Sequence, residues 1–113
     1  MAGAGEPTDL LFQAIDPQGR SVGLARKTFE THIYGRHPGM SPDAIRAAVE
    51  DPDVIIENLD HGSINYLVRM GRGRYRMVAA KRHAHRNPDW EVATAYPRSI
   101  PPHGNLRVLW TRS

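Results

Sequence analysis

The chain has 113 residues and no cysteine, which excludes disulfides and thiolate metal sites. Its net charge is only +3, and its apolar runs fall well short of the roughly 20 residues of a membrane-spanning helix. With no recognisable secretory leader, we expect a flexible lead-in over residues 1–9 and one domain, without membrane contact, over residues 10–113.

The first part of the chain predicts a hairpin followed by a helix. Residues 10–15 and 22–25 have the apolar character of two strands, and a turn containing Pro and Gly separates them. Thr28 is a typical helix N-cap, and helical spacing of apolar residues continues to about residue 36. We therefore predict a first helix that begins at Thr28.

A second helix and a set of strands complete the prediction. Ser41 can cap a helix whose first turn contains Pro42 and the favourable acid Asp43. From residue 54 the apolar period changes to two, the period of strands. The expected strands are residues 54–56, 64–70, 75–80, 91–96 and 106–110. This order predicts an α+β fold, with two N-terminal helices packed on a four- to five-stranded antiparallel sheet.

The two halves of the chain carry opposite net charge. Residues 1–60 contain five Lys or Arg and ten Asp or Glu, a net charge of −5, whereas residues 61–113 contain ten and two, a net charge of +8. Thirteen of the fifteen basic residues are Arg, whose planar fork binds phosphate through two hydrogen bonds. The pattern fits a positive surface for an anionic partner, or a solvated face in a protein rich in Arg for compositional reasons.

Several short motifs occur in a defined order over residues 28–110. They are His32-Ile33 with His37-Pro38, Pro52-Asp53-Val54-Ile55, Tyr66, Val78-Ala79-Ala80 and Thr94-Ala95-Tyr96. In this order they resemble the barnase–EndoU–colicin–RelE-type (BECR) ribonuclease toxins, in particular their phage and polymorphic-toxin branch. The resemblance implies a small α+β toxin that cleaves RNA without a metal or cofactor and is restrained by an antitoxin or immunity protein. It also implies action in the cytoplasm, with delivery as the C-terminal domain of a secreted toxin in bacterial competition.

Two histidines are candidates for acid–base chemistry. Cleavage of RNA by its own 2′-hydroxyl needs a base and an acid, and the ordinary histidine pKa of about 6.5 suits both roles. Our hypothesis is that His32 removes the 2′-hydroxyl proton and His37 protonates the leaving 5′-oxygen. Residues five apart on a helix are separated by about 140° around its axis, so the pair converges only if the helix ends between them. A core position for His32 and a structural hydrogen bond for His37 are the alternatives.

Three further residues are candidates for holding the reacting phosphate. Strict strand alternation predicts that Val92, Thr94 and Tyr96 share one face. The hydroxyls of Thr94 and Tyr96 can donate to a phosphate, and Lys81 can neutralise its developing charge. The alternatives are that Thr94 and Tyr96 are ordinary strand-forming residues and that Lys81 is a surface charge.

We also expect residues that bind the rest of the substrate. Arginines can position the RNA backbone, and a tyrosine can stack on an unpaired base. The candidates are Arg36, Tyr66, Arg74, Arg82 and Arg86. Surface solvation of each arginine and core packing of Tyr66 are the alternatives.

Partners and cofactors follow from the same pattern. His83 and His85 alone give too few ligands for a typical zinc site, so we predict no metal and no other cofactor. The predicted partners are RNA and an inhibitory protein with an acidic surface. A non-catalytic basic module, which binds nucleic acid or an acidic protein, is the competing interpretation.

Overall fold

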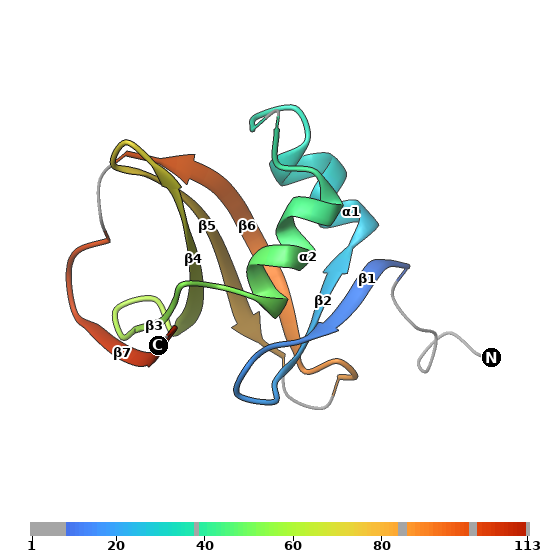
Figure 1. Cartoon of the computed structure of the whole chain (residues 1–113). Helices are drawn as coiled ribbons and strands as arrows, with labels where there is room; N and C mark the ends of the chain where they lie inside the picture. The colour runs from blue at the N-terminus through green and yellow to red at the C-terminus, as the bar shows by residue number, and fades with distance from the viewer. Residues whose placement is uncertain (1–8, 38, 84–85, 100–101, 113) are drawn as a thin grey trace.

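The computed structural model describes residues 9–37, 39–83, 86–99 and 102–112 (Figure 1). The predicted lead-in lies outside these residues except for Asp9, whose carboxylate pairs with Arg26 Nε at 2.8 Å. The elements in chain order are β1 (Leu10–Ile15), β2 (Ser21–Ala25), α1 (Arg26–Thr28), the π-helical segment η1 (Phe29–Ile33), α2 (Pro42–Glu50), β3 (Val54–Asn58), β4 (Ser63–Gly71), β5 (Arg74–Arg82), β6 (Trp90–Arg98) and β7 (Leu106–Thr111). No helix in the described part of the chain is long and apolar enough to cross a bilayer.

The strands form one mixed sheet in the order β1-β2-β6-β5-β4-β3-β7. All neighbouring pairs are antiparallel except β2 and β6, which run parallel. The α+β class is therefore confirmed, but the prediction of four or five purely antiparallel strands is wrong. Apolar periodicity located the strands but not their partners: the N-terminal hairpin joins the sheet beside β6, and β7 pairs with β3.

The two helices differ in how well local sequence signals located them. Ser41 caps α2 as predicted, because its Oγ accepts a hydrogen bond from Ala44 N at 3.1 Å. The prediction that Thr28 begins the first helix is wrong, since α1 begins at Arg26 without a side-chain cap. The helix then widens into η1, where Tyr34 N donates to Phe29 O at 2.8 Å, five residues back.

The main core lies between the helices and one face of the sheet (Figure 1). Ile45, Ala48 and Val49 of α2 are all buried. The strand residues of this core are Phe12, Ala14, Val22, Leu24, Ile55, Ile64, Tyr66, Val78, Ala80, Val92 and Ala95. A smaller cluster of Ile56, Leu67 and Met77 lies apart from this core.

Tyr66 is part of the main core and not of a surface. Its side chain is 0% exposed, and its hydroxyl donates to Asp16 Oδ2 at 2.7 Å. Burial and the hydrogen bond to Asp16 raise the pKa of the Tyr66 phenol well above its ordinary value. The structure therefore contradicts base stacking by Tyr66 and supports the packing alternative.

Candidate active site on the open face of the sheet

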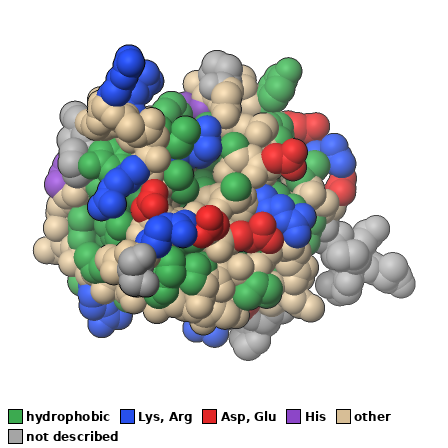
Figure 2. Space-filling view, viewed as in Figure 1, with side chains coloured by type: hydrophobic (Ala, Val, Ile, Leu, Met, Phe, Trp, Pro, Cys, Tyr) green, Lys and Arg blue, Asp and Glu red, His purple; other side chains and the backbone are tan. Residues whose placement is uncertain are grey.

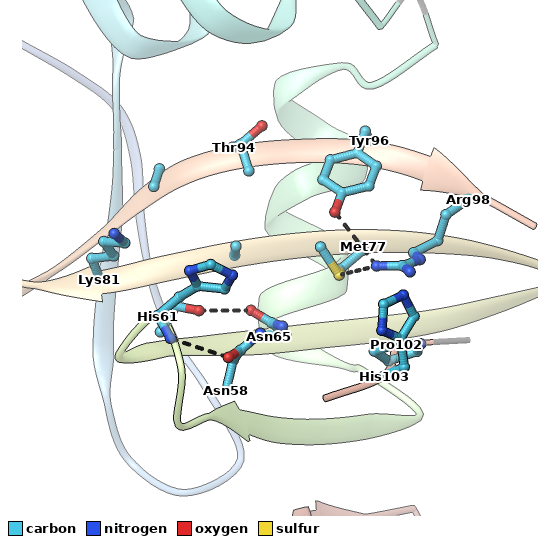
Figure 3. Close-up of a pocket in the computed structure, with 13 residues that line it drawn as sticks. Asn58, His61, Asn65, Met77, Lys81, Thr94, Tyr96, Arg98, Pro102 and His103 are labelled. Carbon is cyan, nitrogen blue, oxygen red and sulfur yellow. Dashed lines mark hydrogen bonds between the residues drawn. The ribbon is translucent and has the colours of Figure 1, made fainter. Parts of the chain in front are cut away.

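A pocket of about 320 Å³ lies on the sheet face opposite α2, which we call the open face. Its walls combine residues of β4, β5 and β6 with the β3–β4 turn and the segment before β7 (Figure 3). The lining residues are Asn58, His61, Ser63, Asn65, Met77, Ala79, Lys81, Ala93, Thr94, Tyr96, Arg98, Pro102 and His103. We call this site the cationic pocket, for the charges described below.

Strand register gives the pocket its floor. Ala79 of β5 lies between Asn65 of β4 and Thr94 of β6, so a small side chain occupies the centre of the row. Two residues along, Met77 pairs with Tyr96, which forms one side of the pocket. The larger polar side chains on both sides of Ala79 therefore surround a depression.

A β-bulge in β6 sets the direction of Thr94. Ala79 pairs with Thr94 but Ala80 pairs with Val92, so Ala93 is the extra residue on β6. Val92 is consequently buried in the helix-side core, whereas Thr94 lines the pocket. The prediction that Val92 and Thr94 share a face is thus wrong, because a bulge shifts side-chain alternation by one residue.

The β3–β4 turn presents His61 to the pocket. Asn58 Oδ1 accepts hydrogen bonds from the backbone N–H of Asp60 at 3.0 Å and of His61 at 3.1 Å. Asn58 therefore holds the turn, and the His61 ring lies over the strands between Lys81 and Asn65 (Figure 3). Sequence reasoning did not select His61, because nothing in its local sequence distinguishes it from a surface turn residue.

A second connection ties this turn to the segment that carries His103. The Asp60 carboxylate accepts from Asn105 Nδ2 at 2.7 Å and from Asn105 N at 3.2 Å, while Leu59 N donates to Asn105 O at 2.8 Å. The hydrogen bonds from Asn105, with the nearby charge of His61, lower the pKa of Asp60 below its ordinary value. We call the Leu59, Asp60 and Asn105 contacts the turn clamp, because they hold together two loops that each supply a histidine.

The electrostatics of the pocket are one-sided. Its ionisable basic groups are His61, Lys81, Arg98 and His103, and none of its lining residues is an Asp or Glu. Lys81 is exposed and, among the described residues, has no carboxylate within ion-pair distance. Arg98 lies over the Tyr96 ring, with its guanidinium carbon 6.0 Å from the ring centroid. Such a pocket favours an anionic ligand, which can accept hydrogen bonds from several donors at once.

The structure brings together some of the predicted catalytic residues and separates others. Lys81, Thr94 and Tyr96 line the same pocket. His37 does not line it, but its ring centroid lies 5.6 Å from that of Tyr96. His32 is exposed on η1 and does not line the pocket, so its catalytic role stays a prediction without geometric support.

The predicted backbone-binding arginines lie outside the pocket. Arg36 is exposed beyond η1, and Arg74 is exposed at the start of β5. Arg82 pairs with Asp89 at 3.3 Å, and Arg86 pairs with Glu91 at 3.3 Å. Sequence reasoning did not select Arg98, the arginine that does line the pocket.

Metal ligands are not gathered in the described part of the chain, where no group of three or more His, Asp or Glu side chains could hold an ion. His83 Nε2 instead lies 3.4 Å from Glu91 Oε2. His85, which the sequence analysis weighs with His83 as a zinc ligand, lies outside the described residues.

Comparisons of the chain with models of protein families, with curated proteins and with solved structures found no match. The chemistry of the cationic pocket and the motif resemblance are therefore the grounds for a function.

Proposed function

We propose that this chain is a metal-independent endoribonuclease. In the proposed reaction, the 2′-hydroxyl of RNA attacks the adjacent phosphorus, and the bond to the 5′-oxygen of the next nucleotide breaks. The products are a 2′,3′-cyclic phosphate and a 5′-hydroxyl. The observation that carries the proposal is a pocket with two imidazoles, an ammonium, a guanidinium and the three hydroxyls of Ser63, Thr94 and Tyr96, and no carboxylate in its lining.

Four of the pocket residues, Lys81, Thr94, Tyr96 and Arg98, bind the phosphate in this proposal. The Lys81 ammonium and Arg98 guanidinium neutralise the negative charge that grows on the phosphate oxygens in the transition state. The hydroxyls of Thr94 and Tyr96 donate hydrogen bonds to the same oxygens. Because the bulge at Ala93 fixes the direction of Thr94 on a strand, this donor is held in place before substrate binds.

The two pocket histidines, His61 and His103, transfer the protons in this proposal. In-line displacement places the attacking and leaving oxygens on opposite sides of phosphorus, so the base and the acid must approach from different directions. His61 lies toward the Lys81 end of the pocket and His103 toward the Arg98 end (Figure 3). One imidazole accepts the 2′-hydroxyl proton, and the other donates a proton to the 5′-oxygen. These roles replace those that the sequence suggested for His32 and His37.

The biological setting of the proposal comes from the motif resemblance. A toxin of this kind acts on RNA in the cytoplasm of a target cell and is restrained by an antitoxin or immunity protein. The cationic pocket offers such an inhibitor a surface complementary to acidic side chains.

A cleavage assay tests the proposed reaction. Total tRNA and mRNA are incubated in EDTA with the wild type and with a folded His61→Ala, His103→Ala double variant, followed by gel and end-group analysis. We expect the wild type to leave cyclic phosphate ends and the double variant to be at least about a hundredfold slower, given the usual contribution of acid–base catalysis. Binding of RNA by the wild type without cleavage would overturn the proposal in favour of a non-catalytic binding module.

A further inference from the structure

A second cavity, of about 220 Å³, lies next to the cationic pocket. Pro102 lines both cavities, and Leu67, in the wall of the second, pairs across strands with Met77 in the wall of the first. Arg69 of β4 and Tyr75 of β5 also line the second cavity. They form the β4–β5 pair two residues beyond Leu67 and Met77, about 7 Å further along the strands. The two cavities therefore form one continuous surface across β3, β4 and β5.

The chemistry of the second cavity differs from that of the first. Ile56 and Leu67 belong to the small apolar cluster and give the cavity an apolar floor, and half-buried Tyr75 forms part of its wall. Asp53 is a lining residue, and its Oδ2 accepts a hydrogen bond from Arg69 N at 2.7 Å. The Asp53 carboxylate also pairs with Arg112 at 3.2 Å, so its charge is balanced, and the apolar floor between these polar groups fits a flat uncharged ring.

We propose that this second cavity is a nucleobase subsite, in which an unpaired base next to the scissile phosphate stacks on Tyr75. The assignment rests on the proposed function for its choice of RNA as ligand. The lining of each cavity determines the orientation: the phosphate enters the cationic pocket, and the neighbouring base lies on the apolar floor of the second cavity. Stacking on aromatic side chains is the usual way in which proteins hold single-stranded bases.

The β4–β5 hairpin offers a path for the RNA beyond this subsite. Arg69, Arg72 and Arg74 are exposed around its tip, and none of them forms an ion pair within the described residues. Unpaired guanidiniums in this position are suited to the backbone phosphates of nucleotides that follow the stacked base.

Binding of non-cleavable oligonucleotides tests the subsite independently of catalysis. The probes are a 2′-O-methyl pentanucleotide with bases and an abasic oligomer of the same length and charge. Dissociation constants are measured for the wild type, Tyr75→Ala, Tyr75→Phe and the matched control Tyr34→Ala, which removes a tyrosine that is 69% exposed and lines neither cavity. Thermal unfolding confirms that each variant is folded.

We expect the wild type to prefer the base-bearing probe and Tyr75→Ala to reduce that preference about tenfold, the typical effect of one lost stacking contact. Tyr75→Phe retains the preference, and Tyr34→Ala does not change it. An unchanged preference in Tyr75→Ala, or no binding of either probe by the wild type, would overturn the subsite. A chain that passes this test but leaves RNA uncut has the subsite and lacks the proposed nuclease activity. A chain that cuts RNA and fails the test is a nuclease whose second cavity serves another ligand, such as an apolar side chain of a protein partner.

Discussion

The chain has two lysines, and they provide a matched test of the cationic pocket. Lys81 lines the pocket, whereas Lys27 is exposed on α1 and does not. We predict that Lys81→Ala weakens binding of single-stranded RNA and makes its salt dependence shallower. The negative slope of log affinity against log salt should become less steep by about 0.7, the value for one lost phosphate contact. Lys27→Ala should leave both quantities unchanged. Equal effects of the two substitutions would mean that RNA meets a diffuse basic surface and not this pocket.

A second residue-scale prediction concerns the buried hydroxyl of Tyr66. Asp16 Oδ2 accepts from Tyr66 at 2.7 Å, and Asp16 Oδ1 accepts from Gln18 N at 2.8 Å and Arg20 N at 2.9 Å. Since hydrogen bonds to charged groups contribute about 1.5–3 kcal/mol, Tyr66→Phe should lower the free energy of unfolding by about that amount in urea titrations. RNA cleavage by the folded variant should not change. Loss of cleavage at unaltered stability would contradict the core role and would indicate that Tyr66 binds the substrate.

At the scale of elements, the turn clamp makes a prediction about pH. Hydrogen bonds from Asn105 lower the pKa of Asp60 below 3.8, the ordinary value for the group. The clamp therefore adds stability above about pH 3.8, and this contribution is lost as the pH falls through the lower folded-state pKa. We predict that the wild type is more stable than Asp60→Asn near neutral pH and that the difference shrinks towards pH 3 in urea titrations. A difference that does not vary with pH would show that the carboxylate charge is irrelevant. Glu57→Gln, which removes an exposed ion pair with Arg107, is the control.

Elements were predictable where the signal is local. Ser41 located the start of α2 because a cap and its helix are adjacent in the chain. The bulge at Ala93 and the parallel pairing of β2 with β6 were not predictable, since both depend on which strands meet in space. Lys81, Thr94 and Tyr96, which the sequence predicts to hold one phosphate, line the same pocket, but Thr94 does not share a face with Val92. His61 was missed because its place in the pocket depends on the turn fold.

At the scale of the whole molecule, folding mixes charges that the sequence separates. Acids of the first half pair with arginines of the second, as in Glu57 with Arg107 at 2.5 Å and Asp53 with Arg112 at 3.2 Å. Figure 2 accordingly shows acidic and basic side chains side by side across the face that it presents. The excess positive charge of residues 61–113 is thus not spread evenly. It is concentrated in the cationic pocket and at the β4–β5 hairpin.

The most direct test compares two histidines that the sequence and the structure rank differently. Rates of RNA cleavage in EDTA are measured for the wild type, His61→Ala and His32→Ala, with thermal unfolding to confirm that each variant is folded. We predict that His61→Ala is slower by about a hundredfold or more, as expected for loss of a general acid or base. His32→Ala should stay within about twofold of the wild type, because His32 is exposed on η1 and does not line the pocket. Full activity in His61→Ala together with loss in His32→Ala would contradict the assignment and place the catalytic centre at η1.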